Sequence, residues 1–115
     1  MALIEIWHNP RCSKSRQTLA LLQERGCDLR VRRYLEDAPE VAELRDVLDR
    51  LGIRAKDLIR KGESRFKELG LTPDSPEEVL LAAMAAHPIL IERPVVFAGD
   101  KAAIGRPPAA VLEIL

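Results

Sequence analysis

A cysteine lies where an apolar stretch joins a segment with helical periodicity. Cys12 follows the apolar run 3–7 and precedes segment 13–25, in which leucines recur at helical spacing. Three basic residues flank it, namely Arg11, Lys14 and Arg16. The first N–H groups of a helix favour an anion, and no carboxylate occupies positions 6–23. Such surroundings lower a thiol pKa from about 8.5 to between about 3.5 and 7.5. The pattern indicates a thiolate nucleophile; the alternative is an inert, buried thiol.

Three further residues near this junction bear on the same chemistry. His8 could stabilise the thiolate or hold the loop, or it could simply end the strand. Ser15 takes the second position of a Cys-x-x-Ser sequence, so its hydroxyl could donate to the thiolate, or it could be an ordinary first-turn residue. Cys27 lies beyond a helix of about 14 residues, which spans about 21 Å. We therefore expect Cys27 to be structural and unable to resolve a bond at Cys12.

Three arginines fall in breaks between the expected elements. Arg60 separates two helical turns, while Arg93 and Arg106 each precede a proline. A guanidinium group is suited to bidentate recognition of an oxyanion, and loops often carry functional residues. Each arginine alone is more often a surface residue than a ligand, so the three together favour an oxyanion site only modestly.

Composition and spacing argue against several other classes of protein. Eighteen basic and eighteen acidic residues give zero net charge, so nucleic-acid binding is not expected. No apolar run approaches the roughly 20 residues that a membrane span needs. His8 and His87 are far apart and the two cysteines form no paired motif, so we expect no metal site. The scattered glycines form no phosphate-binding loop. Without a leader pattern or a disulfide framework, the chain is expected to be cytoplasmic with reduced thiols.

The apolar periodicity predicts an α/β fold in a single domain spanning residues 1–115. We expect strands at 3–7, 29–35, 94–97 and 101–104, and helices at 13–25, 38–51, 55–58, 63–69, 76–86 and 109–115. The resulting order is β-α-β, a helical insertion, then β-β-α. The first two strands should be parallel and the last two should form an antiparallel hairpin.

Several details of this prediction concern helix ends and buried faces. Asp37 should cap the second helix, with Glu40 completing a capping box. On the helix starting near Pro76, the expected buried stripe is Val79, Leu80, Ala83 and Met84. On the last helix, the residues expected to face inward are Val111, Leu112 and Leu115.

Several motifs, taken together, resemble the ArsC family of glutaredoxin-linked arsenate reductases. They occur in order along nearly the whole chain, as His8-Asn9-Pro10-Arg11-Cys12-Ser13-Lys14-Ser15-Arg16, Tyr34-Leu35-Glu36, Leu58-Ile59-Arg60-Lys61, His87-Pro88-Ile89-Leu90-Ile91-Glu92-Arg93-Pro94 and Gly105-Arg106-Pro107. The resemblance implies a thioredoxin-like fold with a four-stranded mixed sheet and a cis peptide between Arg93 and Pro94.

The resemblance also implies roles for individual residues. Cys12 would be the nucleophile and His8 its supporter. The substrate-binding residues would be Arg60, Arg93, Arg106 and Ser15. The implied reaction reduces arsenate, or a similar oxyanion, to arsenite through a covalent thiol–arsenic adduct. Because neither Ser15 nor Cys27 can close a disulfide with Cys12, the electrons would come from outside, with glutathione as co-substrate and glutaredoxin as partner. No bound cofactor is implied.

Two other functions are compatible with the same residues. One is a non-catalytic thioredoxin-like module that binds a protein, with Cys12 as a redox-sensitive or vestigial thiol. A regulatory branch that binds RNA polymerase shares the fold, but its redox-sensing members carry Cys-x-x-Cys, whereas this chain has Ser15. The other is a monothiol oxidoreductase acting on glutathione mixed disulfides, which needs no pocket of three arginines.

Overall fold

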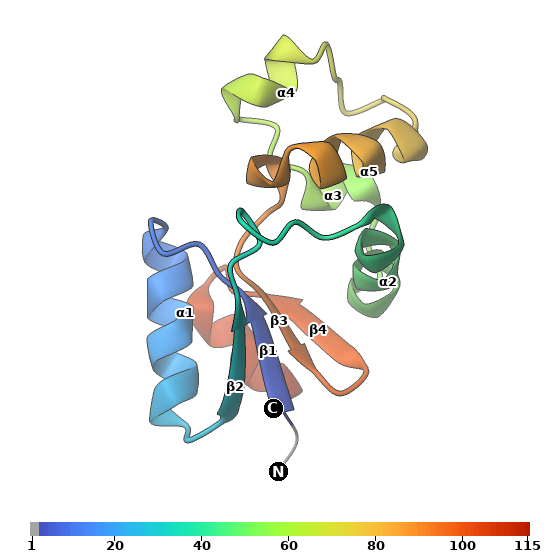
Figure 1. Cartoon of the computed structure of the whole chain (residues 1–115). Helices are drawn as coiled ribbons and strands as arrows, with labels where there is room; N and C mark the ends of the chain where they lie inside the picture. Colours follow the sequence, from blue (N-terminus) through green and yellow to red (C-terminus); the bar gives the residue numbers. More distant parts are fainter. Residues whose placement is uncertain (1–2) are drawn as a thin grey trace. The chain divides into compact units, whose positions relative to one another are not determined.

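The computed structural model describes residues 3–115, which divide into two compact units (Figure 1). The first unit combines the segment ending at Asp37 with residues 93–115, and the second comprises residues 38–92. The second unit is the helical insertion expected between the second and third strands. That the two units act as a single domain stays a prediction.

The first unit contains a four-stranded mixed sheet, as expected. Its strands are β1 (Leu3–Trp7), β2 (Asp28–Arg32), β3 (Val95–Ala98) and β4 (Lys101–Ile104), in the spatial order β2-β1-β3-β4. Strand β1 runs parallel to β2 and antiparallel to β3, and β3 pairs antiparallel with β4. Ile6 lies opposite both Val31 and Val96, so the apolar positions of neighbouring strands share one face.

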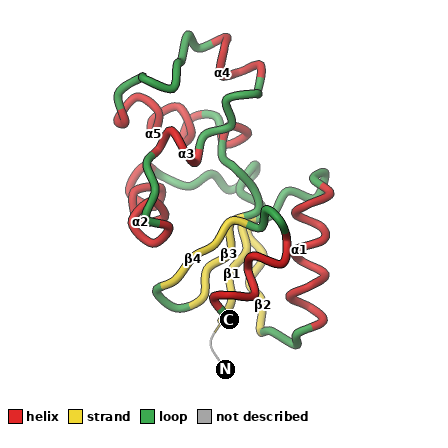
Figure 2. Tube along the Cα trace, turned by 180° about the vertical axis from the view of Figure 1, so that it is seen from behind, coloured by secondary structure: helices red, strands yellow, loops and turns green. Residues whose placement is uncertain are grey.

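Helices α1 (Ser13–Glu24) and η2 (Pro108–Ile114) pack together over that face (Figure 2). The core between sheet and helices consists of Ile4, Ile6, Leu22, Val96 and Val111. Helix α1 ends as expected at a glycine, because Gly26 has a φ of +68°, which a residue with a side chain rarely adopts. Cys27 follows this turn and packs against the core from its edge, in line with a structural role.

Two expected boundaries in this part of the chain are wrong. Strand β2 ends at Arg32 rather than at residue 35, because the backbone turns there, with the Glu36 N–H donating to the Arg33 carbonyl at 3.0 Å. Helix α2 (Val41–Leu51) is capped by Glu40 instead of Asp37. The Glu43 carboxylate accepts the Glu40 N–H at 3.0 Å and completes the capping box one turn later than expected.

The last helix also differs from the expectation, because η2 is a 3₁₀ helix. Side chains three residues apart are eclipsed in such a helix. Val111 and Ile114 therefore contact the core, whereas Leu115 is 49% exposed. The expected inward stripe assumed an α-helix: Val111 is buried as expected, Leu112 is half-buried, and the expectation was wrong for Leu115.

The second unit is helical. It contains α2, α3 (Ala55–Leu58), α4 (Ser64–Glu68), α5 (Glu77–Ala86) and η1 (Pro88–Leu90). Helix α5 packs against α2 and α3, with Leu80, Leu81 and Met84 buried. Val79 is 45% exposed, so the buried face is rotated by one residue from the expected one. A bridge between Ile59 and Ile91 joins the residue that follows α3 to the residue that follows η1.

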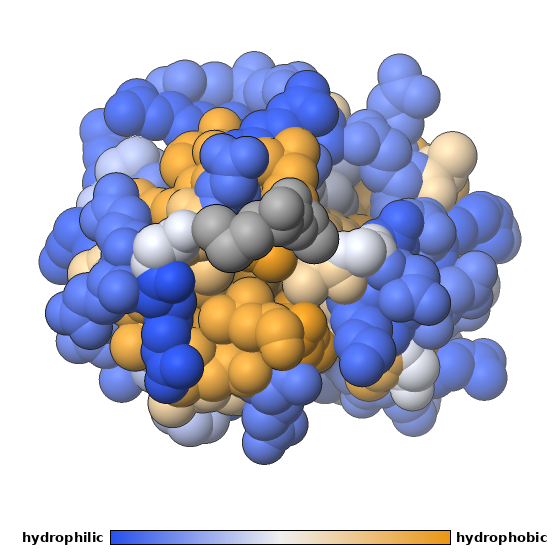
Figure 3. Space-filling model, turned by 90° about the horizontal axis from the view of Figure 1, so that it is seen from below, coloured by the Kyte–Doolittle hydropathy of each residue, from blue (hydrophilic) through white to orange (hydrophobic). Residues whose placement is uncertain are grey.

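The surface of the first unit retains apolar area. Figure 3 shows hydrophobic side chains gathered on the lower face of the molecule. Among the large apolar residues exposed in the first unit, Leu3 is 49% and Val31 45% exposed. Within residues 3–115, no helix has both the length and the apolar character to cross a membrane.

Candidate functional site

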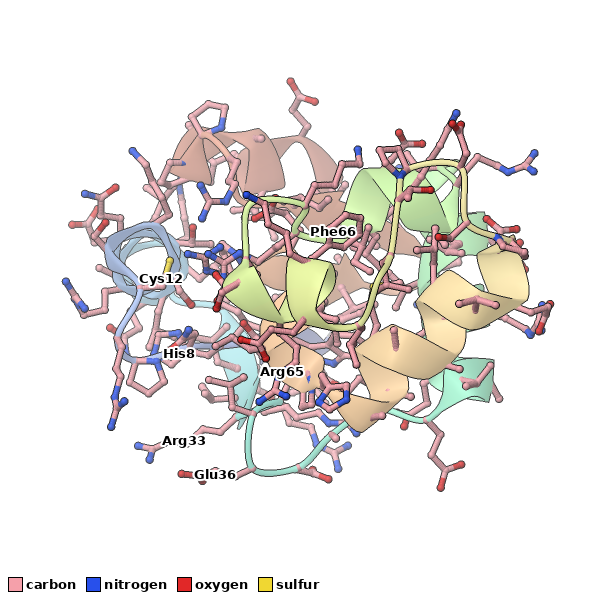
Figure 4. All side chains as sticks on the ribbon, turned by 90° about the horizontal axis from the view of Figure 1, so that it is seen from above. His8, Cys12, Arg33, Glu36, Arg65 and Phe66 are labelled. Atoms are coloured by element: carbon pink, nitrogen blue, oxygen red, sulfur yellow. The ribbon has the colours of Figure 1, made fainter. Side chains whose placement is uncertain are left out.

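Cys12 occupies the N-cap position of α1, directly after the turn that follows β1. Its backbone is extended, with φ −95° and ψ 123°, and its carbonyl accepts the Arg16 N–H at 3.0 Å. The Cys12 N–H donates to the Asn9 carbonyl at 3.0 Å, which closes the turn. Figure 4 places Cys12 at the N-terminal end of α1. The residue is only 8% exposed.

The surroundings of Cys12 lower its pKa below that of an ordinary thiol. Burial is the largest single influence and by itself raises the pKa. It is outweighed by the Ser15 backbone N–H, the charge of Arg93, the Lys14 backbone N–H and a hydrogen bond from Arg93, which all favour the thiolate. The helix N-terminus acts as the sequence predicted, but the basic neighbours at positions 11, 14 and 16 do not supply the charge. Arg93, distant in sequence, supplies it.

His8 and Ser15 form a buried contact behind the cysteine. His8 Nδ1 lies 2.6 Å from Ser15 Oγ, and the same oxygen accepts the Asn9 N–H at 3.0 Å. Ser15 is fully buried and His8 is 6% exposed. The Ser15 hydroxyl therefore fixes the turn that carries Cys12, while the Ser15 backbone N–H acts on the thiolate.

The environment of His8 disfavours its charged form. Burial is the main cause that lowers the pKa of His8 below its usual value of about 6.5, and the charges of Arg33 and Arg16 lower it further. His8 is therefore a neutral imidazole at neutral pH. It supports the loop as a hydrogen-bonding group and not as a cation.

Two of the three expected arginines lie in the same unit as Cys12, and the sheet explains why. Trp7 pairs with Val95, and Val95 pairs with Ile104. The end of β1, the start of β3 and the end of β4 therefore meet at one edge of the sheet. Arg93 precedes β3 and Arg106 follows β4, so both flank the edge at which the Cys12 turn begins.

Arg106 approaches the sulfur directly. Its Nη2 lies 3.9 Å from Cys12 Sγ, and its Nε donates to the Arg93 carbonyl at 2.9 Å. The Arg93–Pro94 peptide is cis, as expected from the resemblance, and the Arg106–Pro107 peptide is also cis, which was not expected. A thiolate beside guanidinium groups is an arrangement suited to binding an oxyanion and attacking its central atom.

Arg60 belongs to the second unit, where its guanidinium group has local partners. Nη2 pairs with Glu63 Oε2 at 3.0 Å, and Nη1 donates to the Ile89 carbonyl at 3.3 Å. The Arg60 backbone N–H donates to the Leu90 carbonyl at 2.7 Å, which fixes the loop. The role of Arg60 as a third oxyanion ligand stays a prediction.

The sequence interpretation overlooked Gly105 and Thr18 as residues that position the site. A Cβ atom on Gly105 would lie 2.5 Å from Thr18 Oγ1 and 2.7 Å from Pro94 Cγ. The Gly105 N–H donates to the Pro94 carbonyl at 2.9 Å. Only glycine therefore fits where the chain passes α1 on its way to Arg106. The available signal was a glycine directly between a strand and an Arg-Pro pair.

Among residues 3–115, no cluster of three or more His, Cys, Asp or Glu side chains could hold a metal ion.

Comparisons with known proteins place this site in a family. The profile described as the ArsC family matches residues 7–114. The chain is 52% identical over 114 residues to the uncharacterized protein YfgD of Escherichia coli, covering 97% of this chain and 96% of that protein. It is 49% identical over 109 residues to an arsenate reductase of Neisseria meningitidis serogroup A, covering 93% of each.

A solved structure agrees with these sequence matches. The arsenate reductase from Vibrio cholerae superposes with a TM-score of 0.95 at 46% identity, covering 99% of this chain and 98% of that one. This likeness confirms the expected thioredoxin-like α/β class. A profile match over most of the chain, with relatives near 50% identity along their full length, leads to one conclusion: the chain belongs to the ArsC family.

Proposed function

We propose that this protein reduces arsenate to arsenite, with Cys12 as nucleophile and with glutathione and glutaredoxin supplying the electrons. The observation that carries the proposal is the Cys12 sulfur, whose pKa is lowered and which lies 3.9 Å from the Arg106 guanidinium. Relatives named arsenate reductase, at 46–49% identity over nearly the whole chain, support the choice of oxyanion.

In this proposal, substrate binding is electrostatic. Arg93 and Arg106 hold the arsenate oxygens beside the sulfur, and Arg60 is the third guanidinium ligand that the family pattern supplies. The N–H groups of the first turn of α1, including that of Ser15, face the same negative charge. Positioned donors of this kind usually contribute most to catalysis, because they need no reorganisation as charge develops.

The first chemical step forms the adduct. The Cys12 thiolate attacks arsenic, a sulfur–arsenic bond forms, and one arsenate oxygen leaves as water after taking up protons. His8 and the Ser15 hydroxyl keep the turn in place while the sulfur reacts. Arsenic remains pentavalent at this stage, so no electrons have yet been transferred.

The second step transfers the electrons and needs a thiol from outside. Cys27 follows the far end of α1, and Ser15 carries no sulfur. A glutathione thiolate attacks the Cys12 sulfur, a disulfide forms, and the sulfur–arsenic bond breaks. Its electron pair goes to arsenic, which leaves as arsenite with a proton from the medium. Glutaredoxin then takes the glutathionyl group and returns Cys12 to the thiol. These steps use no bound cofactor.

A coupled assay tests this proposal. NADPH oxidation is followed with arsenate, glutathione, glutaredoxin and glutathione reductase, and selenate is assayed separately as a rival oxyanion. Wild type and Cys27→Ser should turn over arsenate, and Cys12→Ser should not. Equal rates for wild type and Cys12→Ser would disprove the mechanism. No turnover, together with no arsenate protection of Cys12 from alkylation, would favour a non-catalytic protein-binding module.

A further inference from the structure

A hollow of about 400 Å³ lies beside the loop that carries the nucleophile. Its walls include His8, Arg11, Arg33, Leu35 and Glu36, all in the first unit. The volume falls in the usual range for small-molecule sites. In Figure 4, Arg33 and Glu36 extend toward the same side of the molecule. None of these residues except His8 has a part in the proposed chemistry, so the hollow needs its own explanation.

Two turns at the carboxyl ends of parallel strands build this hollow. After β1, the Cys12 N–H closes a turn onto the Asn9 carbonyl at 3.0 Å, and after β2 the Glu36 N–H closes one onto the Arg33 carbonyl at 3.0 Å. The His8 N–H donates to the Arg32 carbonyl at 2.8 Å and holds the two turns side by side. Crevices at the carboxyl ends of strands are where open α/β sheets bind ligands.

The charges lining the hollow have mixed signs, which narrows the choice of ligand. Arg11 and Arg33 are cations suited to carboxylates, whereas Glu36 is suited to an ammonium group. Leu35 is 38% exposed and adds apolar surface to the lining of the hollow. A ligand with two carboxylates, one ammonium group and a short peptide body would satisfy all of these side chains.

We infer that the hollow binds the thiol co-substrate, a small peptide thiol of the glutathione type, through Arg11, Arg33 and Glu36. Arg11 directly precedes Cys12, so a ligand held here lies beside the turn that carries the nucleophile. The inference rests on the proposed function, which requires a thiol from outside. It adds the place where that thiol binds.

Two other occupants fit the hollow less well. A second oxyanion such as arsenate would meet the arginines but would be repelled by Glu36. A protein reductant would need a contact surface that extends well beyond the hollow, whereas these side chains surround a volume in the range of small-molecule sites.

The binding test uses S-methylglutathione, which keeps the charges of glutathione but has no reactive thiol. Calorimetric titration into wild type is compared with Arg33→Gln and with Arg30→Gln, which removes an equal charge from an exposed position of β2 outside the hollow. Arg33→Gln should weaken binding about ten-fold, whereas Arg30→Gln should not. In the coupled assay, Arg33→Gln should raise the KM for glutathione by a similar factor.

Changing Glu36 and the ligand's amino group separately and together tests the contact between the Glu36 carboxylate and the ligand's ammonium group. Glu36→Gln should weaken binding of S-methylglutathione but not of its N-acetyl derivative, which lacks the positive charge. Equal binding by Arg33→Gln and Arg30→Gln would overturn the inference. So would competition by arsenate for the S-methylglutathione site, or an effect of Arg33→Gln on the KM for glutaredoxin alone.

The outcomes also separate this inference from the proposed function. Arsenate turnover by wild type, with S-methylglutathione binding that is independent of Arg33, would overturn the inference and leave the function standing. Binding that depends on Arg33 and Glu36 in a protein that does not reduce arsenate would support the thiol site and remove the proposed function.

Discussion

Arg106 Nη2 lies 3.9 Å from the sulfur of Cys12, although 94 positions separate the two residues in the chain. The contact depends on the order of the sheet, because β4 ends at the edge where β1 also ends. The guanidinium is held from its other side, where Nε donates to the Arg93 carbonyl at 2.9 Å. Arg93 and Arg106 therefore act on the same sulfur in different ways.

This difference predicts that the two arginines can be separated experimentally. Arg93→Gln should raise the pKa of Cys12, because both the charge of Arg93 and its hydrogen bond favour the thiolate. Arg106→Gln should change that pKa less, but should lower kcat/KM for arsenate by about 10²–10³-fold through loss of an oxyanion donor. The pKa is read from the ultraviolet absorbance of the thiolate in a Cys27→Ser background. Arg30→Gln serves as the control for the loss of one positive charge.

The result that would contradict this division of roles is equally specific. If Arg93→Gln left the thiolate midpoint where it is in wild type, the first turn of α1 alone would account for the acidity of Cys12. Arg93→Lys and Arg106→Lys sharpen the test, because lysine keeps the positive charge but cannot bind an oxyanion with two parallel hydrogen bonds.

The neutral form of His8 predicts how stability depends on pH. Folding lowers the pKa of His8, so the folded protein binds fewer protons than the unfolded chain between the folded pKa and the usual value of about 6.5. The contribution of neutral His8 to the free energy of unfolding is fully present above about pH 6.5, the pKa of His8 in the unfolded chain, and is lost as the pH falls through the pKa of His8 in the folded protein. Urea unfolding should show that the free energy of unfolding falls more between pH 7.5 and pH 5 in wild type than in His8→Asn. Equal losses would show that His8 does not contribute to acid sensitivity.

The sequence was sufficient for the parts of the fold that local patterns determine. The apolar run that forms β1, the glycine after α1 and the turn between β3 and β4 each follow from neighbouring residues. It was not sufficient for the cap of α2, because Asp37 and Glu40 both precede the helix and each has a glutamate three residues later, so the pattern alone does not choose between them.

The candidate site likewise combines features that depend on adjacent residues with features that depend on tertiary structure. The helix N-terminus at Cys12 could be predicted, because it depends on adjacent residues. The approach of Arg93 and Arg106 to Cys12 was favoured modestly by their place in loops and was expected mainly from the family resemblance, since it requires the strand order. The close approach of Gly105 to Thr18 could not be predicted, because it depends on tertiary packing between residues distant in the chain.

The Ser15 side chain and backbone should have separable effects. Ser15→Ala leaves the Asn9 N–H and His8 Nδ1 without their shared buried partner, which should cost about 1–3 kcal/mol of stability. The pKa of Cys12 should change little, because Ser15 acts on it through a backbone N–H that alanine retains. Urea unfolding and thiolate absorbance measure the two effects. Ser13→Ala, at an exposed position of the same turn, is the control.

A marked rise in the pKa of Cys12 in Ser15→Ala would contradict this separation. It would show that the hydroxyl donates to the thiolate itself, which is the other role that the Cys-x-x-Ser spacing allows.

Gly105→Ala tests whether close packing positions Arg106. The added methyl would meet Thr18 Oγ1 and the Pro94 ring, and a proline ring cannot swing aside as a long side chain can. We expect a loss of about 1–3 kcal/mol in the free energy of unfolding, and a lower kcat/KM for arsenate because Arg106 is displaced from Cys12. Gly62→Ala is the matched control, since a Cβ there meets nothing within 4 Å. Adding Thr18→Ala to Gly105→Ala should restore part of the stability, because it removes one of the two clashing groups. Wild-type stability and activity in Gly105→Ala alone would show that the loop has room to shift, and that close packing at Gly105 does not position Arg106.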